Sequence, residues 1–109
     1  MSKTPLRRIR AACCRRSGGA CEACGAHVGE DGELGHLDHF FGRAKVPEAV
    51  SNCWILCAVD CDPAKTASRP SARWWLSRFV LHCQRYGYEE EAYRAQCRMD
   101  VLEQKFPAP

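Results

Sequence analysis

Nine cysteines in 109 residues leave this chain few ways to fold. The number is odd, and the basic N-terminal stretch lacks the apolar segment of a secretory signal, which argues against a disulfide framework. Four of the cysteines form two pairs, Cys21-x-x-Cys24 and Cys57-x-x-x-Cys61, with 32 residues between them. Two turns that each present two thiolates complete a tetrahedral Zn²⁺ site. We therefore expect these four cysteines to hold a structural zinc, which would supply folding free energy on the order of 10 kcal/mol.

The other five cysteines have no partner at ligand spacing, and ordinary buried thiols are the simplest interpretation of them. A second metal site that includes Cys13 and Cys14 is an alternative. His27, which follows the first pair, is a candidate to replace one thiolate on the zinc, in competition with four better-spaced cysteines. The cysteines expected to stay free are Cys13, Cys14, Cys53, Cys83 and Cys97.

Length and composition indicate a single small globular domain, since 46% of the residues are hydrophobic and 27% are charged. No apolar run approaches the roughly 20 residues of a membrane span, so we expect a cytoplasmic protein without a membrane segment. Charge is unevenly distributed: residues 1–16 contain six Lys or Arg and no acid, whereas the rest has 10 against 13 Asp or Glu. We expect a basic N-terminal arm over 1–19, which either holds a polyanion or only aids solubility.

The rest of the chain, 20–109, is predicted to be one domain of the α+β class, with a core over 20–69 and a helical scaffold over 70–109. The pattern predicts a helix in the arm, a turn, two strands, and then three helices. Asp62 and Pro63 suit the cap and the first position of the first of these three helices. The elements are expected over 5–16 for the arm helix, 29–32 for the turn, 34–41 and within 50–57 for the strands, and 71–85 and 89–105 for the last two helices.

Polar residues of a second kind lie between and just after the cysteine pairs. In chain order the segments read CEAC from Cys21, LDHF from Leu37, NCWILC from Asn52 and CDPAKT from Cys61. Over these 46 of 109 residues the chain resembles the zinc-stapled HNH endonucleases, whose pattern is C-x-x-C, D-H, N-x-x-x-L-C and C-H-x-x-K-T. Each segment alone is weak evidence, whereas four in the family's order make a specific match.

The resemblance implies a ββα-metal core, in which two antiparallel strands and a helix hold one divalent cation against DNA. By position, Asp38 and Asp62 would be the ligands of that cation, His39 the general base, and Asn52 the residue that orients the His39 imidazole. General chemistry agrees, because an imidazole with a pKa near 6.5 can deprotonate water at neutral pH and a divalent cation neutralises the leaving oxygen. Adjacent strand residues point to opposite faces, so Asp38 and His39 can serve cation and water separately.

Two departures from the family pattern affect these assignments. Asp62 stands where the family usually has His or Asn, and two carboxylates favour Mg²⁺ or Mn²⁺ over softer metals. The pair Cys57 to Cys61 is one residue wider than usual, although Cys61 keeps its step to Asp62. We expect cleavage of DNA, with RNA as an alternative substrate, and contacts to phosphates from Arg43, Lys65, Arg7, Arg8 and Arg10.

No base-reading set is evident, so specificity is expected to be low or to come from a protein partner, in a monomer or a dimer. The alternative to an enzyme is an inactive zinc module that binds nucleic acid or protein. His36 shares a strand face with Asp38, and is either a third cation ligand or phosphate donor, or a local hydrogen-bonding partner. The aromatic residues Trp54, Trp74 and Trp75 are either core residues or base-stacking residues, and His82 is expected to be structural.

Overall fold

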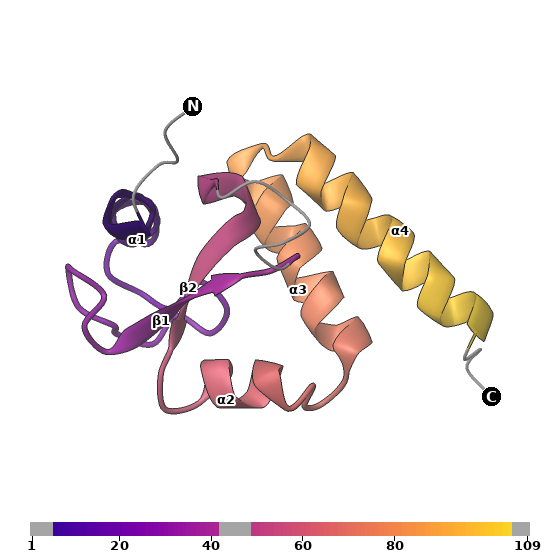
Figure 1. Ribbon diagram of the computed structural model, residues 1–109, viewed down its shortest axis with the longest axis horizontal. Coiled ribbons are helices and arrows are strands. Elements are labelled where there is room, and N and C mark those ends of the chain that lie inside the picture. The colour runs from indigo at the N-terminus through magenta and orange to yellow at the C-terminus, as the bar shows by residue number, and fades with distance from the viewer. Residues whose placement is uncertain (1–5, 42–48, 106–109) are drawn as a thin grey trace. The chain divides into compact units, whose positions relative to one another are not determined.

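The computed structural model describes residues 6–41 and 49–105. The elements in chain order are α1 (Leu6–Ser17), β1 (Gly35–His39), the 3-10 turn η1 (Val50–Asn52), β2 (Cys53–Cys57), α2 (Cys61–Thr66), α3 (Ala72–Tyr86) and α4 (Glu89–Lys105) (Figure 1). They form two compact units, Met1–Ala64 and Lys65–Pro109, whose boundary falls within α2. The described part of the chain is thus a small α+β protein with a two-stranded antiparallel sheet, as the sequence predicts.

The sheet of the first unit pairs β1 with β2 in the register Gly35 opposite Cys57 and His39 opposite Cys53. All five residues of β2 are buried, because the run CWILC is apolar on both faces of the strand. Polar residues alternate through β1, which is more exposed than β2. Strand β1 is shorter at both ends than the strand predicted over 34–41. The residues just before β2 form η1.

Helix α1 belongs to the first unit, although its sequence indicates a basic arm. Ile9, Cys13 and Cys14 are buried, and the Cys13 thiol lies 3.8 Å from the carbonyl oxygen of Cys53. The helix therefore contacts β2 with one face and leaves other positions, including Arg7 and Arg8, exposed. The segment predicted as a separate arm is an element of the unit that contains the cysteine pairs.

Helix α2 begins at Cys61, one residue before the predicted cap. The Cys61 N–H donates to the Cys57 sulfur at 3.3 Å, and the Ala64 N–H donates to the Asp60 carbonyl at 3.1 Å. These bonds satisfy backbone groups at the helix start. Because the helix begins at Cys61, Asp62 lies inside its first turn rather than at the cap. Its carboxylate still lies where it suits the positive end of the helix.

The second unit contains α3 and α4, which lie side by side (Figure 1). Ser71 caps α3 by accepting a hydrogen bond from the Trp74 N–H at 3.1 Å, and Gly87 ends it with a left-handed φ of 77°. These signals explain why the predicted bounds of both helices agree with the structure to within one residue. His82 is buried and stacks on Phe79 at 5.6 Å between ring centroids, as a core residue would. In the described ranges, no helix combines the length and apolarity needed to cross a bilayer.

Candidate functional site

The first cysteine pair lies on a tight turn that leads toward β2. The Gly25 N–H donates to the Cys21 carbonyl at 2.9 Å, and the Cys21 N–H donates to the Ala26 carbonyl at 2.7 Å. Gly25 has a φ of 85°, a left-handed conformation that a side chain would strain. The turn thereby directs Cys21 and Cys24 to the same side of the backbone.

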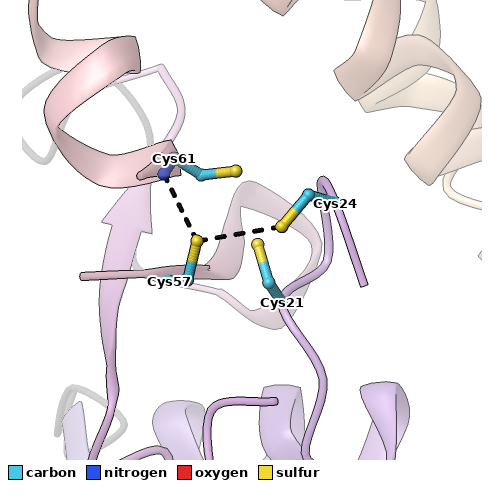
Figure 2. A group of neighbouring side chains, drawn as sticks. All are labelled: Cys21, Cys24, Cys57 and Cys61. Carbon is cyan, nitrogen blue, oxygen red and sulfur yellow. Dashed lines mark hydrogen bonds between the residues drawn. The ribbon is translucent and has the colours of Figure 1, made fainter. Parts of the chain in front are cut away.

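The second pair completes a cluster of four thiols. Cys57 ends β2 and Cys61 begins α2, and Figure 2 shows all four sulfurs converging from these elements and the turn. The four sulfur atoms lie within 4.8 Å of one another. A tetrahedral Zn²⁺ with Zn–S bonds of about 2.3 Å would set its sulfurs about 3.8 Å apart. The Cys24 and Cys57 sulfurs are 3.8 Å apart, so the cluster fits a metal ion such as zinc.

Ionisation of these thiols depends on their surroundings. Burial raises the pKa of Cys57, but the N–H groups of Cys61 and Asp60 oppose it and the net pKa is lowered. Burial also raises the pKa of Cys61 and of Cys24, and neighbouring thiols add to the increase at Cys61. Without a metal, one thiolate is therefore favoured at Cys57, whereas Cys24 and Cys61 resist ionisation. A divalent metal removes that resistance because it neutralises the charge that the thiolates would place in one small space.

The other candidate ligands lie outside this cluster. In residues 6–41 and 49–105, the four cysteines form the single group of three or more such side chains close enough to share a metal ion. His27 is exposed and is not part of it. The five remaining cysteines are free thiols, four of them buried and Cys97 half-buried.

A buried ion pair, not predicted from the sequence, joins the turn to α1 and β2. Arg16 donates from Nε and Nη2 to the two carboxylate oxygens of Glu22, each at 2.7 Å, and their side chains are 9% and 1% exposed. Arg16 also donates to the carbonyls of Val50 and Cys53, at 3.0 and 2.9 Å. The backbone of Ile55 accepts from the Glu22 N–H and donates to its carboxylate. Glu22 lies between Cys21 and Cys24, so its ion pair with Arg16 fixes the turn of these two cysteines against β2.

Asp38, the first predicted cation ligand, lies directly across the sheet from Trp54. The Trp54 indole N–H donates to its Oδ2 at 2.8 Å. Trp54 is fully buried and Trp75 is 4% exposed, so both are core residues, whereas Trp74 is 38% exposed. The alternative that bases stack on Trp54 or Trp75 is therefore wrong.

Asp62, the second predicted cation ligand, lies beside His36. The His36 Nδ1 is 2.8 Å from the Asp62 Oδ2, and the two side chains are 58% and 28% exposed. His36 and Asp38 are two residues apart in β1 and therefore share a face of the strand. His36, Asp38 and Asp62 do not form a group with ligand atoms within 4.8 Å, so in the described residues the two carboxylates have different neighbours.

His39 and Asn52, the predicted base and orienting residue, lie where the two strands meet their connecting segment. His39 ends β1 and Asn52 directly precedes β2. The Asn52 backbone carbonyl accepts from the Phe40 N–H at 2.9 Å, and its side-chain oxygen accepts from the Phe41 N–H at 3.1 Å. The His39 Nε2 and the Asn52 Nδ2 are both buried without a hydrogen-bond partner in the part of the chain that the structure describes.

The basic residues predicted to contact phosphates differ in their surroundings. Arg7 and Arg8 are exposed on α1. Arg10 instead donates to the carbonyls of Gly32 and Gly35, at 2.8 and 3.4 Å, and thus contributes to the fold. Lys65 is half-buried in the last turn of α2. Arg43 lies outside the described residues.

Comparison with protein families, curated proteins and solved structures gives no match for this chain. The candidate site must therefore be interpreted from its own residues: four cysteines that could hold a metal ion lie between the turn, β2 and α2, and the predicted polar residues lie on β1, η1 and α2.

Proposed function

We propose that this chain is a metal-dependent endonuclease of the HNH type that hydrolyses DNA phosphodiester bonds with low intrinsic sequence specificity. The first support for this proposal is the order of the elements, which is strand, strand and helix. These elements and the residues next to them carry the side chains that resemble the HNH set. Asp38 and His39 end β1, Asn52 precedes β2, and Asp62 is in the first turn of α2. The thiol cluster joins the end of β2 to the start of α2 and would hold these elements together.

The observation that carries the proposal is that, of the three buried polar side-chain atoms without a hydrogen-bond partner in the described residues, two are His39 Nε2 and Asn52 Nδ2, the third being His82 Nε2 in α3. A buried polar atom without a hydrogen bond costs about 1–3 kcal/mol. Such atoms in native proteins call for an explanation, and a catalytic role is one of the known explanations. Two of the three occur here on the residues that the resemblance assigns to proton transfer and to orientation, and this coincidence favours an enzyme.

In this mechanism His39 would accept a proton from the attacking water, and Asn52 has the orienting role that the resemblance assigns to it. Asp38 and Asp62 would hold the divalent cation, Mg²⁺ or Mn²⁺, which stabilises negative charge on the leaving 3′ oxygen when bound. Mg²⁺ keeps several of its waters and commonly uses only one or two carboxylates, so a compact cage of protein ligands is unnecessary. Binding would require Asp62 to give up its contact with His36, at 2.8 Å.

Contacts with phosphates complete the proposal. Arg7 and Arg8 are exposed and basic, and Lys65 and Arg43 are the further phosphate contacts that the sequence predicts. Binding that depends on phosphates weakens steeply with salt and does not select a sequence. Specificity would then come from a protein partner or from the form of the DNA, and RNA is the alternative substrate.

A second function, an inactive zinc module that binds nucleic acid or protein, is favoured by a different observation. Both proposed ligands of the catalytic cation already have a protein partner, since Trp54 donates to Asp38 and His36 contacts Asp62. In such a module these contacts would be purely structural. It would bind zinc and DNA but would cut no bond with any added cation.

Nicking of supercoiled plasmid by the zinc-loaded protein separates the two functions. We expect relaxed circles with Mg²⁺ or Mn²⁺ and none in buffer without a divalent cation. Such a buffer is a better control than EDTA, because EDTA also competes for zinc. Asp62→Asn should reduce nicking by about tenfold or more, because it removes a charged ligand. The matched control is Asp60→Asn, an exposed carboxylate next to the same helix, which should nick like the wild type. DNA binding without nicking under every cation would establish the inactive module instead.

A further inference from the structure

The stretch 63–88, which contains all of α3, has no acidic residue. The acidic residues that follow it all belong to α4, namely Glu89, Glu90, Glu91, Asp100 and Glu103. Half of the ten Lys and Arg after position 16 lie in this acid-free stretch, and they are Lys65, Arg69, Arg73, Arg78 and Arg85. Such a separation of charge is typical of a segment that binds a polyanion.

The outer face of α3 is a continuous stripe of exposed and half-buried residues. Its members recur three or four residues apart, and they are Trp74, Ser77, Arg78, Leu81, Gln84 and Arg85. The buried residues of the helix include Trp75, Phe79 and Cys83. At 3.6 residues per turn, the stripe and the buried residues occupy opposite sides of the helix. The apolar side of α3 is therefore buried, and the stripe is polar and basic apart from Trp74 and Leu81.

Both arginines of this stripe lie over aromatic rings. The Arg78 Cζ is 5.3 Å from the centroid of the Trp74 ring, and the Arg85 Cζ is 5.6 Å from that of Tyr86. Such a contact restrains a long side chain at the surface, which lowers the entropy lost when it binds a ligand. A guanidinium stacked through its flat face keeps its N–H groups at its edge, where they suit phosphate oxygens. Because Arg78 covers part of the Trp74 ring, contact of Arg78 with a phosphate is favoured over stacking of a base there.

We propose that the outer face of α3 binds the DNA backbone, and that Arg78 and Arg85 contact its phosphates. The two arginines are two helical turns apart, about 10 Å along the axis, so they can reach separate phosphates. Charge complementarity selects this occupant, because no acidic residue interrupts the stripe. An anionic membrane suits it less well, since the apolar side of α3 is buried and cannot enter a bilayer. The choice of DNA rests on the proposed function, but the inference concerns binding and not cleavage.

The salt dependence of DNA binding tests this surface. Fluorescence anisotropy follows binding of the full, zinc-loaded chain to a labelled duplex of mixed sequence, in buffer without a divalent cation so that the duplex stays intact. The double variant Arg78→Gln, Arg85→Gln should bind about tenfold or more weakly at about 100 mM salt. It should also lower the slope of log K against log salt by about 0.9 for each arginine removed, because fewer counterions are released.

The matched control is the double variant Arg94→Gln, Arg98→Gln, which removes the same charge from α4. These arginines are exposed on the helix that holds the acidic residues, and Arg94 lies 3.6 Å from Glu90. The slope for this variant should stay close to that of the wild type, and circular dichroism verifies that both variants keep their helices. Equal slopes for the two double variants would overturn the proposal. A wild type that does not bind the duplex, or that binds anionic phospholipid vesicles or polyglutamate as tightly, would also overturn it.

This measurement separates the inference from the proposed nuclease activity. A chain whose salt slope depends on Arg78 and Arg85 but that nicks no plasmid would support the surface on α3 and contradict only the cleavage. A chain that nicks plasmid while the α3 variant keeps the wild-type slope would support the nuclease and contradict the surface.

Discussion

Removal of zinc should unfold the first unit, Met1–Ala64. The four thiols join the turn at Cys21 and Cys24 to the end of β2 and the start of α2. A structural zinc contributes on the order of 10 kcal/mol of folding free energy, which is comparable to the whole stability of a small domain. Without it, the thiols cannot all ionise in one small space, and the Glu22 contacts with Arg16 and Ile55 are left to hold the turn against β2.

The measurement is hydrogen exchange of β1 and β2 amides in the wild type and in Cys57→Ser, with the zinc content of each determined. We expect Cys57→Ser to lose zinc and amide protection together. Cys97→Ser is the matched control, because Cys97 is half-buried and lies outside the cluster. A Cys57→Ser variant that retains protected strands without zinc would show that the metal is not needed for this fold.

Loss of the buried ion pair between Arg16 and Glu22 should produce the next largest decrease in the free energy of unfolding. Glu22→Gln removes the negative charge that faces Arg16 and leaves the guanidinium, 9% exposed, without compensation. Breaking one partner of a buried pair costs about 3–5 kcal/mol. Because Glu22 anchors the turn of the first cysteine pair to Ile55, the variant should also bind zinc more weakly.

Urea unfolding followed by exchange at β2 amides measures the free-energy change. The control is Glu30→Gln, the same substitution at an exposed position of the same unit, which should change stability by less than about 0.5 kcal/mol. Equal stability of Glu22→Gln and Glu30→Gln would mean that the pair contributes nothing and that the turn is held by the metal alone.

The sequence predicts the parts of this fold that depend on local signals. The spacing of Cys21, Cys24, Cys57 and Cys61 predicts that these four thiols come together, because thiolates a few residues apart can reach one ion. The apolar period together with Ser71 and Gly87 fixes the bounds of α3 and the start of α4. These features need no knowledge of how distant segments pair.

The parts that escape prediction depend on register and packing. Arg16 is one of six basic residues before position 17, and its partner Glu22 becomes evident only once α1 lies against β2. The contact of Trp54 with Asp38 follows from a strand register that the sequence leaves open. His36 offered a partial signal, because it shares a strand face with Asp38, but its contact with Asp62 requires the placement of α2.

The most direct test of the nuclease proposal compares plasmid nicking by the wild type with that of His39→Ala, both zinc-loaded, with Mg²⁺ or Mn²⁺. Removing a general base lowers the rate by about a hundredfold to ten-thousandfold. His27→Ala, at an exposed histidine outside the cluster, is the matched control and should cut like the wild type. The account predicts that His39→Ala keeps its zinc and loses nicking, with partial recovery on addition of imidazole. Nicking by His39→Ala at the wild-type rate, or none by the wild type with either cation, would contradict it.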